Sequence, residues 1–238
     1  MTPTIYALHA LAVSPEMWHD VRDAAPDLTF VAPDLAEVVE EPGSEGSLAT
    51  FVRKLADRAP AGPLLLLGAS IGANFALELA AVLGERVRGT LLVVPGPPAA
   101  DEAFLERTSG LLRTLRHAWN DEMAAAFVPL LVYRFGPRYA QVAERVERML
   151  RRNGARAAPL LELSPAFAPA AELLPRIPGP VRILVAADNS NPIVGPHVLE
   201  DWRQLLGTEA VQRVSSASEF LPMERPEVVV EALRALIG

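Results

Sequence analysis

The chain has 238 residues, of which 50% are hydrophobic and 21% are charged, a composition typical of a globular protein. Its length allows one or two domains, and a single α/β domain often reaches this size. The formal net charge is −7 and Lys and Arg form no dense block, so nucleic acid is not an expected partner. The absence of cysteine excludes disulfides, thiolate catalysis and cysteine-ligated iron–sulfur clusters.

The sequence also indicates a protein that works away from membranes. The N-terminal residues carry no cationic segment of the kind that opens a secretory signal, so we expect a cytoplasmic location. The most apolar stretch, residues 63–83, is interrupted by Ser70, Asn74 and Glu78. A membrane span of about 20 residues would not carry polar groups on several faces. We therefore expect no membrane partner.

Short apolar runs alternate with amphipathic stretches along most of the chain. Several of the apolar runs are continuous, as strands buried on both faces are. Strands that alternate with helices predict an α/β fold with a mostly parallel sheet flanked by helices. We expect residues 1–238 to form one such domain. In chain order, strands are expected at residues 5–8, 28–31, 64–67, 90–94, 181–185 and 211–214, and helices at 48–58, 71–83, 198–206 and 226–237.

Residues 101–174 interrupt this alternation, because they predict three or four consecutive helices with no strand between them. Apolar side chains recur there mostly three and four residues apart, which gives one apolar face. Packing against the sheet is the simplest explanation of that face. A helical lid above a binding site would show the same pattern. The apolar positions include Leu105, Leu111, Leu112, Leu115 and Trp119.

A pentapeptide of the form G-x-S-x-G, Gly68-Ala69-Ser70-Ile71-Gly72, separates the predicted strand at 64–67 from the predicted helix at 71–83. This context is the one required of a nucleophile elbow. A tight strand-to-helix turn holds the serine in a strained conformation, and small flanking residues let neighbouring chains approach. The serine hydroxyl then projects over the helix N-terminus, where N–H groups stabilise a developing oxyanion. Ser70 is therefore the candidate nucleophile, and an ordinary glycine-bounded turn is the alternative.

With this elbow, the chain resembles the α/β-hydrolase superfamily over nearly its whole length. Leu8-His9-Ala10 followed by Met17-Trp18 is similar to the family's first oxyanion loop, which usually has Gly where this chain has Ala10. Pro33-Asp34-Leu35 matches the segment after the next strand, and the insertion at 101–174 lies where the family places its lid. The resemblance implies that the backbone N–H groups of Leu11 and Ile71 are the oxyanion donors. It also implies substrate contacts from His9, Ala10, Trp18 and Trp119.

Two positions depart from the family pattern. The segment Phe220-Leu221-Pro222-Met223-Glu224-Arg225-Pro226 is close to a family signature that normally has Gly-His before the Phe, whereas this chain has Ser218 and Glu219. The catalytic histidine is therefore replaced by Glu219. The catalytic acid is ambiguous as well, because alignment on Pro192 places Asn191 at that position and alignment on the end of the preceding strand offers Asp188.

The four histidines offer no obvious replacement base. The family order along the chain is nucleophile, acid and then histidine, and His9, His19 and His197 all fall outside that last position. The family's equivalent of His9 is mostly structural. We expect packing or surface roles for all four, with His117 of the insertion as the best-placed substitute.

These observations predict an enzyme with a degenerate triad. A serine without an adjacent base is a poor nucleophile, so an ordinary esterase is disfavoured and Ser70 should react slowly. Burial would raise the pKa of Glu219, and such a carboxyl can remove a proton next to a carbonyl while the oxyanion hole holds the enolate. We expect a lyase or cyclase that acts on a small, apolar, polyketide-like carbonyl compound without a cofactor or metal. A serine hydrolase with an atypical base and a non-catalytic small-molecule-binding protein are the alternatives.

Overall fold

Six parallel strands form the centre of the molecule, in the order β2-β1-β3-β4-β5-β6. The structure is a computed structural model and describes residues 2–41, 47–188 and 197–238. The parallel sheet expected from the sequence is confirmed. The strands are β1 (Thr4–Leu8), β2 (Phe30–Val31), β3 (Leu64–Ala69), β4 (Val87–Val93), β5 (Val181–Ala186) and β6 (Val211–Val214).

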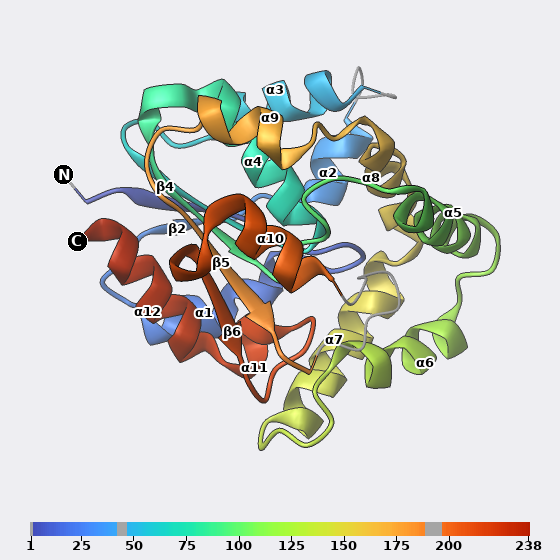
Figure 1. Cartoon of the computed structure of the whole chain (residues 1–238). Helices are drawn as coiled ribbons and strands as arrows, with labels where there is room; N and C mark the ends of the chain where they lie inside the picture. Colours follow the sequence, from blue (N-terminus) through green and yellow to red (C-terminus); the bar gives the residue numbers. More distant parts are fainter. Residues whose placement is uncertain (1, 42–46, 189–196) are drawn as a thin grey trace.

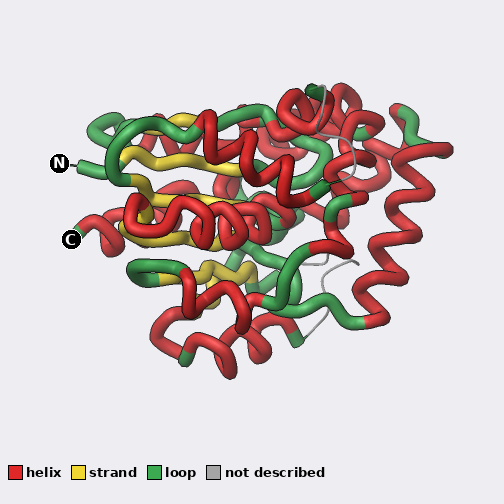
Figure 2. Tube along the Cα trace, turned by 90° about the horizontal axis from the view of Figure 1, so that it is seen from above, coloured by secondary structure: helices red, strands yellow, loops and turns green. Residues whose placement is uncertain are grey.

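Helices cover both faces of this sheet (Figures 1 and 2). On one face α4 packs against β3 and β4, with α3 beside it; on the other α12 packs against β4 and α1. Every residue of β3 is buried, which explains its continuous run of apolar side chains. The helices of this body are α1 (His19–Ala24), α2 (Leu35–Glu40), α3 (Leu48–Arg58), α4 (Ile71–Leu83), α10 (Val198–Leu206), α11 (Leu221–Glu224) and α12 (Pro226–Ile237).

The chain between β4 and β5 is an insertion with five helices among its elements. Figure 1 shows α5, α6 and α7 beyond the carboxyl ends of the strands. Side chains at the N-caps of α5 and α6 fix where these helices begin, because Asp101 accepts the Phe104 N–H at 2.6 Å and Asn120 accepts the Met123 N–H at 2.9 Å. The inserted helices are α5 (Glu102–His117), α6 (Asp121–Leu131), α7 (Tyr139–Asn153), α8 (Ala158–Glu162) and α9 (Ala170–Leu173).

Ion pairs and aromatic contacts hold the insertion on the body. Arg145 and Arg138 both reach Asp20 of α1, with Nη1–Oδ2 and Nη2–Oδ1 distances of 2.5 and 2.8 Å. Near α9, the Phe167 ring packs edge-on against Phe75 of α4, with 5.0 Å between ring centroids. The insertion is therefore attached to the body along α7 and near its C-terminal end, beside α9.

Five of the six expected strands differ in length from the structure, although β1 and β5 are each only one residue longer than expected. The run at 28–31 is a strand only at Phe30 and Val31, because the chain before it turns through a hydrogen bond from the Leu28 N–H to the Ala25 carbonyl. β3 continues to Ala69. β4 begins earlier than expected, at Val87, and ends at Val93, because Val94 takes a positive φ of 46° and leaves the sheet. Among the described residues, no helix is long and apolar enough to span a bilayer.

Candidate functional site

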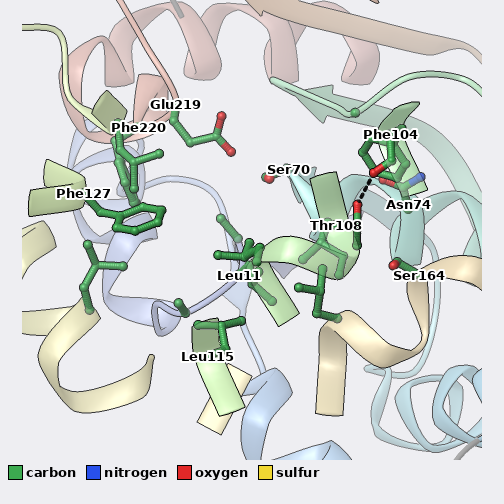
Figure 3. Close-up of a pocket in the computed structure, with 18 of the residues that line it drawn as sticks. Leu11, Ser70, Asn74, Phe104, Thr108, Leu115, Phe127, Ser164, Glu219 and Phe220 are labelled. Atoms are coloured by element: carbon green, nitrogen blue, oxygen red, sulfur yellow. Dashed lines mark hydrogen bonds between the residues drawn. The ribbon is translucent and has the colours of Figure 1, made fainter. Parts of the chain in front are cut away.

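Ser70 lies at the turn between β3 and α4 in a strained backbone conformation. Its φ and ψ are 52° and −122°, a region that residues other than glycine rarely adopt. Two backbone hydrogen bonds fix it there: the Ser70 N–H donates to Val93, and the Ala73 N–H donates to Ser70. Such strain costs about 1–3 kcal/mol and persists where the surrounding structure enforces it. The turn directs the hydroxyl group into a cavity beneath the insertion (Figure 3).

The two glycines of the pentapeptide are required by close backbone contacts. A Cβ atom on Gly68 would lie 2.3 Å from the carbonyl oxygen of Gly72. A Cβ atom on Gly72 would lie 2.3 Å from the carbonyl oxygen of Leu8 and 2.5 Å from that of His9. Because these atoms belong to the backbone, no side-chain rotation can relieve the overlap. The pentapeptide therefore packs the elbow directly against the loop after β1.

The cavity in front of Ser70 has a volume of about 100 Å³, counted as the space open to the centres of water molecules. One water needs roughly 10–15 Å³ on this measure, so the space holds a small organic ligand. The body supplies the part of the cavity that contains Ser70, and the insertion supplies most of the wall. Most lining side chains are apolar, and the described ones are Ala10, Leu11, Ala12, Ser70, Ile71, Asn74, Gly96, Phe104, Thr108, Leu111, Leu115, Trp119, Phe127, Leu131, Leu150, Leu161, Ser164, Phe167, Glu219 and Phe220.

Glu219 lines the same cavity as Ser70 and is only 4% exposed. Figure 3 shows its carboxylate on the loop before α11, directed toward the side of the cavity where the Ser70 hydroxyl lies. The residue at the position of the family's histidine therefore shares one cavity with the candidate nucleophile.

A second carboxylate, Glu224, lies behind Glu219 and is 9% exposed. Its Oε2 accepts the Ser218 N–H at 2.6 Å, and its Oε1 accepts the Tyr133 N–H, just after α6, at 2.5 Å. Burial raises the pKa of Glu224; the two N–H donors lower it, the neighbouring Glu219 and Asp188 raise it, and the net direction is upward. Glu224 therefore ties the insertion to the loop that carries Glu219. Sequence reasoning treated Glu224 only as part of a signature.

Leu11 and Ile71, the residues expected to supply oxyanion donors, both line the cavity. The Ile71 N–H is the first of α4, and the first four N–H groups of a helix have no intrahelical acceptor. The loop of Leu11 turns sharply, since Ala12 has a φ of 60°. Ala10 also lines the cavity, and its N–H points away to the Met17 sulfur at 3.2 Å. The two expected donor residues thus line the same cavity as Ser70.

His9 and Trp18 are buried in the core and do not line the cavity as described. The His9 ring bridges two backbone groups: its Nδ1 lies 2.8 Å from the Ala10 carbonyl oxygen, and its Nε2 accepts the Leu35 N–H at 2.9 Å. This pattern fits a neutral ring that fastens the loop after β1 to the start of α2. The expected substrate contacts of His9 and Trp18 are therefore replaced by packing in the structure.

No histidine is found among the described lining residues. His19, His117 and His197 are exposed, so the insertion's His117 is not placed to serve as the base. Trp119, by contrast, lines the cavity. Its indole N–H donates to the Leu150 carbonyl at 3.2 Å, and Gly154 makes room for the ring, because a Cβ there would lie 2.0 Å from it.

The candidate acids lie outside the cavity or outside the described residues. Asp188 is exposed at the end of β5, where its Oδ2 accepts the Ser216 N–H at 2.9 Å and its own N–H donates to the Ala217 carbonyl. It therefore supports the segment that leads to Glu219 without lining the cavity. Asn191 falls in residues 189–196, which the structure does not describe. Within the described part of the chain, no three His, Cys, Asp or Glu side chains gather so as to hold a metal ion.

Comparison with known proteins agrees with this architecture. A model of the alpha/beta hydrolase family matches residues 5–232, whereas no curated protein matches. A membrane phospholipase A described as a bacterial virulence factor is 19% identical, with a TM-score of 0.76, over 99% of this chain and 78% of that one. An esterase from Thermogutta terrifontis is 24% identical, with a TM-score of 0.74, over 100% and 92% of the two chains. A hydrolase from Oleispira antarctica is 14% identical, with a TM-score of 0.75, over 100% and 91%.

At these identities the solved structures show a shared fold alone. The family model, in contrast, spans almost the whole chain, including the elbow and the loop of Glu219. On that basis this protein belongs to the α/β hydrolase family.

Proposed function

We propose that this protein is a hydrolase of small, uncharged, mostly apolar esters, with Ser70 as nucleophile and Glu219 as base. The observation that carries the proposal is the buried Glu219 carboxylate, which faces Ser70 at a strained elbow within one apolar cavity (Figure 3). The family supports hydrolysis over the lyase or cyclase activity favoured by the sequence, since two of the similar structures are named an esterase and a hydrolase.

The proposed reaction proceeds through an acyl-enzyme. Glu219 takes the hydroxyl proton as Ser70 Oγ attacks the ester carbonyl, and the N–H groups of Ile71 and Leu11 hold the oxyanion. The C–O bond of the ester breaks, and the leaving alcohol receives the proton from Glu219. A water molecule, deprotonated by the same carboxylate, then attacks the acyl carbon and releases the acid, and Ser70 recovers its proton.

The cavity lining favours an uncharged substrate. Among the described lining residues there is no Lys, Arg or His to pair with an anion, and the Glu219 carboxylate would repel one. The inserted helices supply the apolar wall with Phe104, Trp119, Phe127 and their leucine neighbours. We propose that this insertion acts as a lid that excludes water during the reaction.

A fluorophosphonate probe tests the proposal without knowledge of the substrate. Wild type should be labelled at Ser70, as shown by mass spectrometry of the peptide that contains it, and Ser70→Ala should not be labelled. Glu219→Gln preserves the shape of the side chain and removes its basicity, so labelling should slow by about 10²–10⁴-fold. His117→Ala is the matched control and should label like wild type. Equal labelling of wild type and Glu219→Gln would refute a basic role for Glu219.

A second candidate is proton transfer next to a carbonyl, as in a lyase or cyclase step. The observation that favours it is the carboxylate itself, because a carboxylate is a weaker activator of serine than histidine but a competent base toward an acidic C–H. Exchange of ketone α-hydrogens in deuterium oxide, followed by proton NMR, measures this directly. Exchange that depends on Glu219, without labelling of Ser70, would favour this candidate. Ligand binding with neither reaction would indicate a binding protein.

A further inference from the structure

Three polar side chains interrupt the apolar wall of the cavity on the side away from Glu219. Figure 3 shows Asn74, Thr108 and Ser164 there, contributed by α4, α5 and the 3₁₀ turn Ser164–Ala166. Asn74 Oδ1 and the Phe104 ring both lie within 4 Å of the position that a Cβ would take on Gly96. Phe104 in turn accepts a hydrogen bond from Thr108 Oγ1 through its carbonyl oxygen, at 2.7 Å. None of these three side chains takes part in the proposed hydrolysis.

Ser164 is the strongest sign of a ligand. It is 3% exposed, it lines the cavity, and its hydroxyl group forms no hydrogen bond within the described part of the chain. A buried polar group without a hydrogen-bond partner destabilises the folded protein. A serine in a helical turn can usually bond back to a carbonyl one turn earlier, but this hydroxyl does not. The protein therefore keeps a destabilising hydroxyl group at the wall of its cavity.

The hydrogen-bonding capacity of the three side chains defines the missing group. The hydroxyl group of Thr108 already donates its one hydrogen to the Phe104 carbonyl oxygen, so toward the cavity its oxygen can only accept a hydrogen bond. Ser164 can donate and accept, and so can the amide of Asn74. A ketone or ether could satisfy Ser164 and Asn74 but not Thr108. A hydroxyl group both donates and accepts, and it can therefore satisfy the acceptor and one of the donors together.

We propose that Asn74, Thr108 and Ser164 form a subsite for a hydroxyl group of the substrate, on the part of the ligand away from Glu219. The substrate class is then an apolar ester with a hydroxyl group on its carbon chain. This assignment rests on the proposed function for the ester group alone, since the subsite would recognise a hydroxylated ligand in a protein that performs no chemistry. A charged group does not fit, because the three side chains are neutral.

The test uses binding and turnover separately. The ligands are methyl octanoate and methyl esters of octanoic acid that carry one hydroxyl group at carbons 3 to 8. Affinity is measured by calorimetry on Ser70→Ala, which binds without turnover, and kcat/KM is measured on the protein with Ser70 intact. Ser164→Ala and Thr108→Val remove the subsite groups. Thr114→Val is the matched control, because Thr114 makes the same backbone bond within α5, to Gly110 at 3.2 Å, and does not line the cavity as described.

We expect at least one hydroxylated ester to bind about tenfold tighter than methyl octanoate, a difference of about 1.4 kcal/mol, which one well-formed hydrogen bond can supply. In Ser164→Ala and Thr108→Val this preference should fall to twofold or less, and Thr114→Val should retain it. Without ligand, Ser164→Ala should unfold at the same temperature as the parent protein or higher, because the lost hydroxyl was unsatisfied.

Two outcomes would overturn the subsite. One is equal affinity for all the esters, which would mean that the polar groups hold only water. The other is a fall of more than about 3 °C in the unfolding temperature of Ser164→Ala, which would indicate a structural hydrogen bond. Failure of the proposed function looks different: the hydroxylated ester would still bind selectively to Ser70→Ala, while the protein with Ser70 intact would not hydrolyse it. Hydrolysis of all the esters at the same rate would support the proposed function and refute the proposed subsite.

Discussion

Replacement of Glu224 by alanine should both destabilise the protein and impair the site. Its carboxylate is buried and accepts one N–H from the insertion, at Tyr133, and one from Ser218, which precedes Glu219. Alanine removes both acceptors at once and leaves two buried N–H groups without partners. The substitution therefore loosens the loop of the proposed base and one attachment of the insertion together.

The magnitude follows from the two lost hydrogen bonds. An orphaned buried N–H costs about 1–3 kcal/mol, so two cost about 2–6 kcal/mol. Part of this loss is offset, because alanine also removes a buried carboxylate whose burial raises its pKa and disfavours its charged form. We expect a net loss of about 3 kcal/mol in unfolding free energy. For a domain of this size the unfolding temperature should fall by roughly 6–12 °C.

Chemical and thermal unfolding measure this loss, with Glu227→Ala as the control. Glu227 is three residues away, its side chain is 61% exposed, and it pairs with Arg225 at 2.5 Å on the surface. Its removal should change the unfolding free energy by less than about 0.5 kcal/mol. Labelling of Ser70 by the fluorophosphonate should also slow in Glu224→Ala and not in Glu227→Ala, because only Glu224 holds the loop of Glu219.

The pH dependence of the loss has a definite sign. The pKa of Glu224 is raised in the folded state, so the folded protein holds the proton more tightly than the unfolded chain does. The contribution of this group to stability is therefore fully present below the ordinary pKa of Glu and is lost as pH rises through the raised value. The stability difference between wild type and Glu224→Ala should shrink from mildly acidic to alkaline pH. A stability loss below about 1 kcal/mol would refute the assigned hydrogen bonds. A difference that grows with pH would refute the raised pKa, because the two N–H donors alone would lower it.

Two further substitutions test the packing of the elbow and of the loop after β1. Gly72→Ala should lower the unfolding free energy by more than about 3 kcal/mol and abolish labelling of Ser70, because its Cβ would overlap two backbone oxygens. The control Gly110→Ala, in α5, should be neutral or stabilising by about 0.5–1 kcal/mol. Equal unfolding temperatures for the two variants would contradict this expectation. His9→Leu should cost about 2–4 kcal/mol by denaturant unfolding, because the Leu35 N–H and the Ala10 carbonyl lose their partners, and an unchanged midpoint would show that the ring is dispensable.

The elements that the sequence predicts well are those whose apolar pattern matches their burial. The run at 64–67 is continuously apolar because β3 is covered on both faces, and the helix at 71–83 was expected with its observed bounds. The strand at 28–31 was overestimated, because the turn at Leu28 depends on a backbone hydrogen bond that composition does not encode. The short helix α2 was missed, since one turn and a half carries too little periodicity to detect.

The site was predicted in part. The pentapeptide located Ser70, and the resemblance located Glu219 in the same cavity. Trp18 was expected near substrate but lies in the core, because a loop position carried over from a family does not fix which way a side chain points. Asn74 was not recognised as a site residue, although its position in the first turn of α4, directly after Ser70, was a usable signal. The contribution of Ser164 depends on how the insertion folds over the body, which no local pattern reveals.

The division of the cavity between body and insertion makes the protein modular. The atoms proposed to react belong to loops at the ends of strands, while the shape of the wall comes from helices inserted between two consecutive strands of the chain, β4 and β5. An insertion transplanted from another family member would then alter the accepted substrate and spare the chemistry. A transplanted insertion would have to supply a basic side chain at the position of Arg145 to pair with Asp20 of the body. It would also need a basic side chain at the position of Arg156 to pair with Glu40. These two acidic positions on the body are where such recombination would succeed or fail.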